Sequence, residues 1–199
     1  SQGASYFRRM SCLGLTRKCI AHLVDRQKSK AVTAIPHQII RPLDEVESAD
    51  VVLFVTFQAK GYEARYVNHY LSSLKEAGKK VLLIKVVDEL YEPRQEIGID
   101  LADGCMMREN HGYDFAAWAH ALRLFPKLYQ ARTLTFINDS VFGPFNREHF
   151  QTLLRKCDAA DLDLMGLTES FDSNHHFQSY FFCMKLGETT TPAIRAFWN

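Results

Sequence analysis

The stretch 51-VVLFVTFQAKGYEARYVNHYLSSLKEAGKKVLLIKVV-87 contains two unbroken apolar runs, residues 51–57 and 81–87, on either side of a helical pattern. Apolar runs of this length are typical of strands that are buried on both faces of a sheet. Apolar residues recur at helical spacing over residues 63–77, and Gly78 ends the predicted helix. A strand, a crossover helix and a second strand form a β-α-β unit, so we expect the two strands to be parallel.

The same alternation continues along the rest of the chain and predicts an α/β fold. Further strands are predicted over residues 104–110, 133–137, 163–167 and 178–186, and further helices over 114–125, 147–157 and 190–198. Before the first strand, residues 31–48 contain two prolines and mixed polar residues, which indicates a linker or an irregular lead-in. We therefore divide the chain into a basic N-terminal segment with its linker, residues 1–49, and a domain over residues 50–199.

Length and composition favour one globular domain with a real core and an appendage. The chain has 199 residues, of which 47% are hydrophobic and 24% charged, and its net charge of +1 gives no reason to expect a nucleic-acid partner. Five cysteines without a CxxC pair indicate buried free thiols in a reducing compartment, so we expect a cytoplasmic protein. The chain begins without Met and stops inside a helical pattern, so we expect that C-terminal elements are missing from it.

Residues 1–30 are rich in arginine and lysine and carry a single acid, Asp25. Apolar residues are interleaved with these charges, so the segment could form a basic amphipathic helix on the inner face of the cell membrane. The alternative is a solvated helix whose apolar side packs on the domain, because runs of charge usually mark a face in contact with water.

Three polar clusters each follow a predicted strand: 108-RENHGYD-114, 138-NDS-140 and 168-TESFDSNHHFQS-179. In an open α/β sheet, ligands bind outside the carboxyl ends of the strands. Three clusters after three strands therefore predict one shared crevice.

The first cluster offers two interpretations for each of its charged residues. Asp114 could bind a ligand, or it could cap the helix that it opens. Arg108 could pair with a diphosphate or with Asp114. Gly112 permits a tight entry into the helix or the close approach of a ligand.

The second cluster places Asp139 between two other oxygen-bearing residues, Asn138 and Ser140. Mg²⁺ or Mn²⁺ is commonly held by one or two carboxylates together with substrate phosphates and water. Only one of the three residues is a carboxylate, so Asn138 and Ser140 could instead bind ligand hydroxyls directly. The alternative is a turn in which Asp139 and Ser140 cap the following Gly-Pro loop.

The third cluster contains candidates for a general base. Glu169 could remove a proton from an attacking hydroxyl, and His175 or His176 is the rival for that role. Adjacent histidines point in different directions on a strand, and their spacing does not suit zinc. Ser140 lacks the G-x-S-x-G turn of a hydrolase nucleophile.

Together, 108-RENHGYDFAAW-118, 137-INDSVFGP-144 and 166-GLTES-170 with 175-HHFQSYF-181 resemble the rhamnan synthesis protein F family. The segment 51–74 is similar to that family's opening strand and helix, so the resemblance covers about residues 50 to 198. Members of this family are bacterial glycosyltransferases that build cell-wall and lipopolysaccharide polysaccharides.

The resemblance implies a GT-A-like or Rossmann-like, mostly parallel sheet flanked by helices. It also implies a nucleotide-sugar donor, for which dTDP-L-rhamnose is the example, and a glycan or lipid-linked acceptor. By position, Asp139 would hold the metal ion, and Glu169 and His176 would be catalytic. The residues expected to bind the nucleotide sugar or to line its acceptor side are Thr56, Phe57, Arg108, Asn110, Gly112, Asp114, Asn138, Ser140 and Gln178. The alternative function is a catalytically inactive module that binds nucleotides or glycans.

Overall fold

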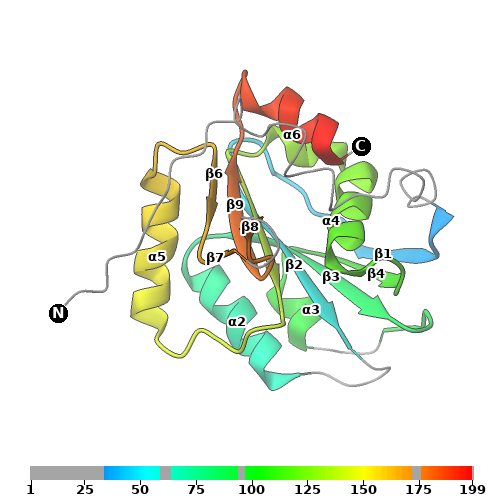
Figure 1. The fold of residues 1–199 in the computed structure, drawn as a ribbon. Coiled ribbons are helices and arrows are strands. Elements are labelled where there is room, and N and C mark those ends of the chain that lie inside the picture. The colour runs from blue at the N-terminus through cyan, green and yellow to red at the C-terminus, as the bar shows by residue number, and fades with distance from the viewer. Residues whose placement is uncertain (1–33, 59–63, 94–96, 172–175, 199) are drawn as a thin grey trace.

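The computed structural model describes residues 34–58, 64–93, 97–171 and 176–198, so the basic segment 1–30 lies outside the described residues. Seven strands form one sheet in the order β1-β4-β3-β2-β5-β9-β6 (Figure 1). The strands are β1 (His37–Arg41), β2 (Asp50–Phe57), β3 (Lys80–Val87), β4 (Gly104–Glu109), β5 (Thr133–Asn138), β6 (Leu164–Gly166) and β9 (Phe181–Lys185). A separate pair, β7 (Glu169–Ser170) and β8 (His176–Phe177), forms a small antiparallel sheet.

The four central strands of the sheet are parallel, which confirms the β-α-β unit. Val51 of β2 lies between Lys80 of β3 and Leu134 of β5, and β4 continues the parallel pairing beyond β3. Strands β1 and β9 run antiparallel to their neighbours, and β6 runs antiparallel to β9. Strand β6 therefore shares the direction of β5, and its carboxyl end lies at the same edge of the sheet.

Helices cover both faces of this sheet. Helices α2 (Arg65–Glu76), α3 (Ile97–Leu101) and α5 (Arg147–Ala159) pack on one face, and α4 (Tyr113–Leu124) and α6 (Thr190–Trp198) pack on the other. The residues of β2 alternate between the two cores, because Leu53 joins the α4 face and Phe54 joins the α2 face. The prediction of an α/β sheet flanked by helices is confirmed.

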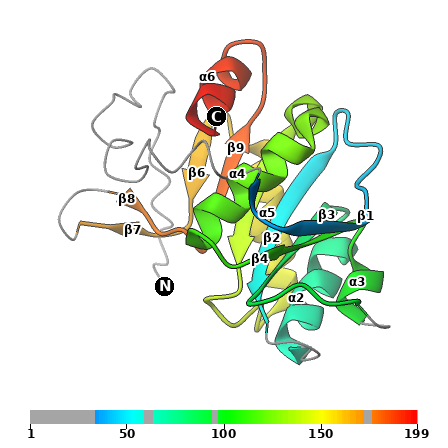
Figure 2. The ribbon, with the colours of Figure 1, turned by 90° about the vertical axis from the view of Figure 1, so that its right-hand side faces the viewer.

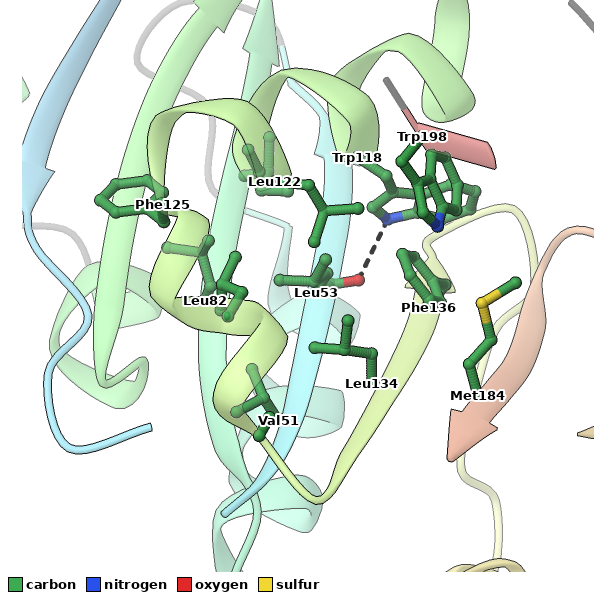
Figure 3. Close-up of a cluster of buried hydrophobic side chains, with 14 of the residues drawn as sticks. Val51, Leu53, Leu82, Trp118, Leu122, Phe125, Leu134, Phe136, Met184 and Trp198 are labelled. Atoms are coloured by element: carbon green, nitrogen blue, oxygen red, sulfur yellow. Dashed lines mark hydrogen bonds between the residues drawn. The ribbon is translucent and has the colours of Figure 1, made fainter. Parts of the chain in front are cut away.

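The core under α4 is built around the indole of Trp118 (Figure 3). Its Nε1 donates a hydrogen bond to the Leu53 carbonyl at 3.1 Å, and its ring meets that of Phe136 edge-on, with centroids 5.5 Å apart. Phe136 also stacks on Trp198 of α6 at 4.9 Å. These contacts fix both helices of this face against β2 and β5, and α4 carries one side of the site described below.

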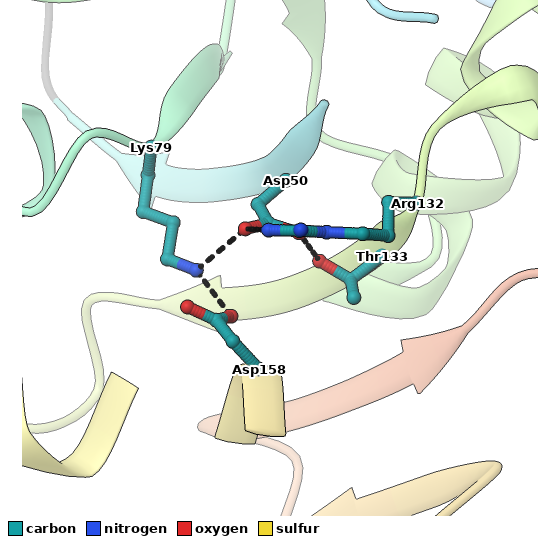
Figure 4. Close-up of polar contacts among 5 residues, drawn as sticks. All are labelled: Asp50, Lys79, Arg132, Thr133 and Asp158. Atoms are coloured by element: carbon teal, nitrogen blue, oxygen red, sulfur yellow. Dashed lines mark hydrogen bonds and ion pairs between the residues drawn. The ribbon is translucent and has the colours of Figure 1, made fainter. Parts of the chain in front are cut away.

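A charged cluster closes the amino end of the sheet (Figure 4). Asp50, the first residue of β2, accepts hydrogen bonds from Arg132 and from the Thr133 hydroxyl, the latter at 2.9 Å. The Lys79 side chain is 3% exposed and forms ion pairs with both Asp50 and Asp158 of α5. Burial raises the pKa of Asp50, but its hydrogen bonds and the nearby positive charges outweigh burial and lower the pKa to about 2.

The structure differs from the sequence prediction in the lead-in and in short elements. Residues expected to form an irregular linker contain β1, which pairs with β4, and Leu43 and Val46, which lie in the core. The sheet therefore begins before residue 50. Three short elements were not predicted: the β7–β8 hairpin, which Figure 2 shows standing out from the sheet, helix α3, and the 3-10 helix η3 (Pro126–Gln130).

Three of the five cysteines, Cys105, Cys157 and Cys183, are buried free thiols, as expected, and burial raises their pKa values to about 12, 12 and 11. Within the described residues, no helix combines the length and the apolar character that crossing a bilayer requires.

Candidate functional site

The order of the strands determines where a ligand crevice can form. From β2 the chain moves through β3 to β4 on one side, whereas β5 lies against the opposite side of β2. The chain order therefore reverses between the neighbouring strands β2 and β5, which makes this position the topological switch point of the parallel strands. In α/β sheets, ligands bind at such a point, outside the carboxyl ends of the strands.

Asp139 lies at this switch point, directly after β5. Its Oδ2 accepts a hydrogen bond from the Thr56 hydroxyl at 2.6 Å, and the Tyr66 hydroxyl lies 3.4 Å from the same oxygen. Thr56 comes from the end of β2 and Tyr66 from the first turn of α2. The carboxylate accepts these bonds from β2 and α2 rather than from the Gly-Pro loop, which does not support the turn-capping alternative.

Asn138, the preceding residue, points to the other face of the sheet. Its side-chain amide donates to Asp114 Oδ2 at 2.6 Å, and its Oδ1 accepts from the backbone N–H of Ser140 at 3.2 Å. Because successive side chains of a strand alternate, Asn138 reaches the α4 side while Asp139 reaches the α2 side. The two carboxylates therefore flank the end of β5, with the buried Asn138 as the link to Asp114.

Burial dominates the electrostatics of these two carboxylates. It raises the pKa of Asp114, against the hydrogen bond from Asn138, and it raises the pKa of Asp139, against those from Thr56 and Tyr66. The charge of Asp114 raises the pKa of Asp139 further. Among the described residues, no lysine or arginine forms an ion pair with either one. The ionised pair therefore favours the approach of a cation or of hydrogen-bond donors.

A divalent ion would find a partial ligand set here. The described residues contain no group of three or more histidine, cysteine or acidic side chains placed to hold a metal. Mg²⁺, however, is often held by one or two carboxylates while substrate phosphates and water complete its shell. Asp139 would supply one such carboxylate, and Asp114, on the other side of the end of β5, would supply a second, which 138-NDS-140 lacks by itself.

The turn before α4 positions Asp114. Gly112 is the N-cap residue with a φ of 80°, no side chain caps the helix, and Tyr113 also has a positive φ, of 58°. A left-handed conformation is unfavourable for tyrosine, and this ring is 86% exposed. Asp114 thus lies in the first turn and contacts Asn138, so the alternative in which it caps the helix is not observed.

Arg108 is buried beneath the turn at residues 111–113 and is not exposed to a ligand. Its side chain is fully buried, and Nη2 donates to the His111 carbonyl at 2.8 Å, so the predicted pairing with Asp114 is not observed. Its Nε and Nη1 have no partner among the described residues, and burial lowers its pKa to about 10. Arg108 therefore holds the turn that presents Asp114, whereas Asn110 is exposed beside it.

The third predicted cluster lies on the hairpin that follows β6, at the same edge of the sheet. Glu169 of β7 is partly buried and pairs with Phe177 of β8, whereas His176 is exposed. The backbone of Gln178 donates to the Thr168 carbonyl at 3.0 Å. The rival base His175 lies outside the described residues, and the roles of Glu169, His176 and Gln178 stay predictions.

Sequence reasoning missed two aromatic residues of the site. Tyr66 contacts Asp139, and its ring meets that of Phe142 edge-on, with centroids 4.8 Å apart. The sequence did contain a signal for Tyr66. It lies in the first turn of the crossover helix that follows β2, and β2 ends at the switch point. Phe57, which was predicted, is the last residue of β2 and is 50% exposed.

Comparison with known proteins connects this geometry to a family. The sequence model described as rhamnan synthesis protein F matches residues 82–199, more than half of the chain. The chain is 28% identical over 163 residues to the uncharacterized protein y4gN of Sinorhizobium fredii, covering 76% of this chain and 40% of that protein. It is 28% identical over 156 residues to the virulence protein VirA of Vibrio anguillarum, covering 74% and 47%. The chain thus spans less than half the length of these relatives.

Proposed function

Because the chain belongs to the rhamnan synthesis protein F family, we propose that it serves polysaccharide synthesis as a glycosyltransferase. In this proposal a sugar, for which rhamnose is the candidate, moves from a nucleotide-sugar donor to a growing cell-surface polysaccharide or a lipid-linked acceptor. The family gives the process, and the reaction is inferred from the site, since a fold alone does not determine chemistry.

One observation carries the proposal: Asp114 and Asp139 flank the end of β5 at the switch point of the sheet, where Thr56, Tyr66 and Asn138 orient them. Two partly buried carboxylates without a described basic partner suit a divalent ion, which would attract the diphosphate of the donor. Mg²⁺ or Mn²⁺ held there would stabilise the negative charge that the leaving diphosphate gains. The chain's own residues hold the carboxylates in place before any ligand arrives.

Glu169 is the proposed general base. It would take the proton of the acceptor hydroxyl while that oxygen attacks the anomeric carbon and the bond to the diphosphate breaks. Attack from the face opposite the leaving group inverts the configuration of the sugar. Its position on the hairpin after β6, at the same edge as Asp139, supports this role.

Nucleotide binding tests the carboxylate pair. We expect Asp139→Asn to weaken the binding of dTDP or UDP in the presence of Mn²⁺ by roughly 10-fold or more, because one ionic ligand is lost. Titration calorimetry with and without a chelator measures this effect, and Asp100→Asn on the exposed surface of α3 is the matched control. Equal affinity of the Asp139 variant and the wild type under both conditions would refute the metal role.

Turnover tests the base. With a panel of nucleotide sugars and Mn²⁺, we expect Glu169→Gln to lower nucleotide release by roughly 10²-fold or more while nucleotide affinity stays nearly unchanged. Glu148→Gln, an exposed change in the first turn of α5, should leave turnover unaffected. Full activity of the Glu169 variant ends this assignment. Nucleotide binding by the wild type without turnover of any donor or acceptor would favour the inactive binding module instead.

A further inference from the structure

Exposed apolar side chains gather at one edge of this protein. The described residues include seven exposed large hydrophobic side chains, and six of them lie at the carboxyl end of a strand or in the segments that follow: Phe57, Tyr113, Val141, Phe142, Phe145 and Phe171. The seventh, Ile39, lies on the edge strand β1. Scattered exposed hydrophobic residues need no explanation, but a concentration at the edge of the sheet that carries Asp114 and Asp139 indicates a binding surface.

Phe142 is the member of this group with a contact to the residues around Asp139. Its ring is 64% exposed, yet one side rests edge-on against the ring of Tyr66. The loop that carries it is tied to α2, because the Pro144 carbonyl lies 2.9 Å from His69 Nε2 and Arg147 pairs with Glu76 at 2.5 Å. An exposed ring on an anchored loop is ordered before a ligand arrives, which reduces the entropy lost on binding.

Phe142 is also linked directly to the carboxylate pair. The Tyr66 ring that supports Phe142 carries the hydroxyl that lies 3.4 Å from Asp139 Oδ2. A ligand whose charged end lies at Asp139 therefore has a flat apolar surface next to it, on the α2 side of the sheet. No comparable ring contact supports Phe145, which is in the same loop and is 95% exposed, within the described residues.

We propose that Phe142, supported by Tyr66, is the stacking surface for the base of a nucleoside diphosphate whose phosphates lie at Asp139. This inference rests on the proposed function and names a subsite within it. Of the groups attached to a nucleotide sugar's diphosphate, the base is the flat aromatic one. Such a base stacks face-on or edge-on with an aromatic side chain, whatever its hydrogen-bonding pattern.

The test separates the base from the phosphates by comparing two kinds of probe. We expect Phe142→Ala, in the full chain with Mn²⁺, to weaken the binding of dTDP and UDP by roughly 10-fold and to leave inorganic pyrophosphate unaffected. Phe142→Tyr should restore nucleotide affinity, because it keeps the aromatic face. Ile39→Ala, an exposed apolar change on edge strand β1 outside this group, is the matched control and should bind all three probes like the wild type. Thermal unfolding without ligand checks that each variant is folded.

Each result has a distinct meaning. Unchanged dTDP and UDP affinity in Phe142→Ala overturns the stacking surface but leaves the proposed transferase intact. An equal loss for pyrophosphate and nucleotides also overturns it, because the change then acts on the phosphate end. A variant that alters only the apparent affinity for an acceptor assigns this ring to the acceptor and overturns the proposal too. A wild-type chain that binds none of the probes refutes the transferase and the subsite together.

Discussion

At the scale of single residues, the site depends on two neighbours that point in opposite directions. Asn138 and Asp139 end the same strand, yet one contacts Asp114 on the α4 side and the other contacts Thr56 on the α2 side. The strand alternation was visible in the sequence, and so was the polar motif at the strand end. The pairing with Asp114 was not, because it depends on how α4 lies across the sheet, which no local pattern encodes.

Arg108 shows a similar limit at one position. Its place near the end of a strand indicated a charge that faces a ligand, but its parity on β4 turns the side chain toward α4 and under the turn of His111. Its neighbour there is the buried His120, whose ring nitrogens have no partner among the described residues. Burial, followed by the positive charge of Arg108, lowers the pKa of His120 to about 4.

This buried cation leads to a prediction about stability. Arg108→Met has a similar volume and removes a buried charge with two nitrogens unpartnered among the described residues, so we expect no loss of unfolding free energy and a gain of up to about 1 kcal/mol. Loss of the hydrogen bond to His111 should loosen the turn that carries Asp114 and weaken nucleotide binding. Denaturant unfolding and calorimetry measure the two effects. A loss of stability above about 2 kcal/mol would show that the charge is compensated after all.

At the scale of elements, every predicted strand and helix of the domain is observed, whereas several short elements were not predicted. Strands β2 and β3 and helices α2, α4 and α5 follow from runs of apolar residues or from helical spacing, and the structure confirms them. Strand β1 was missed because prolines flank it and its residues are mixed. It is stabilised by pairing with β4, a contact between distant segments. The β7–β8 pairing likewise involves strands of two residues each, too short for any periodicity.

The close packing of the lead-in on β4 can be tested at Gly104. A Cβ on this residue would lie 2.7 Å from Leu43 Cβ and 2.9 Å from the Leu43 Cα, so an alanine must displace backbone. We expect Gly104→Ala to lower the free energy of unfolding by about 1–3 kcal/mol, the usual range for overpacking. In the control Gly187→Ala, the nearest atom is the Thr190 hydroxyl at 3.7 Å, an ordinary contact. Equal stability of both variants would mean that the lead-in does not pack against β4 in solution.

At the scale of the whole molecule, the two ends of the sheet differ in how their charges are compensated. At the amino end, Asp50 is surrounded by Lys79, Arg132 and Thr133, and its pKa falls to about 2. At the carboxyl end, Asp114 and Asp139 are both partly buried, and both pKa values are raised. One end therefore stabilises the fold with ionised groups, whereas at the other end ionisation of the carboxylates reduces stability.

These opposite shifts predict opposite dependences on pH. In the folded state the pKa of Asp50 lies below its ordinary value of 3.8. Its contribution to stability, of about 2 kcal/mol, is therefore present above pH 4 and is lost as pH falls toward 2. The pKa of Asp139 is raised, so its ionisation reduces stability as pH rises above about 4. We expect Asp50→Asn to be less stable than the wild type at pH 7 and nearly equal to it near pH 2. Asp139→Asn should be more stable than the wild type at pH 7 and equal to it at pH 3. Urea unfolding of the three proteins in metal-free buffer at pH 2 to 7 measures both trends. If Asp139→Asn were less stable than the wild type at pH 7, the ionised Asp139 carboxylate would stabilise the fold, contrary to this prediction.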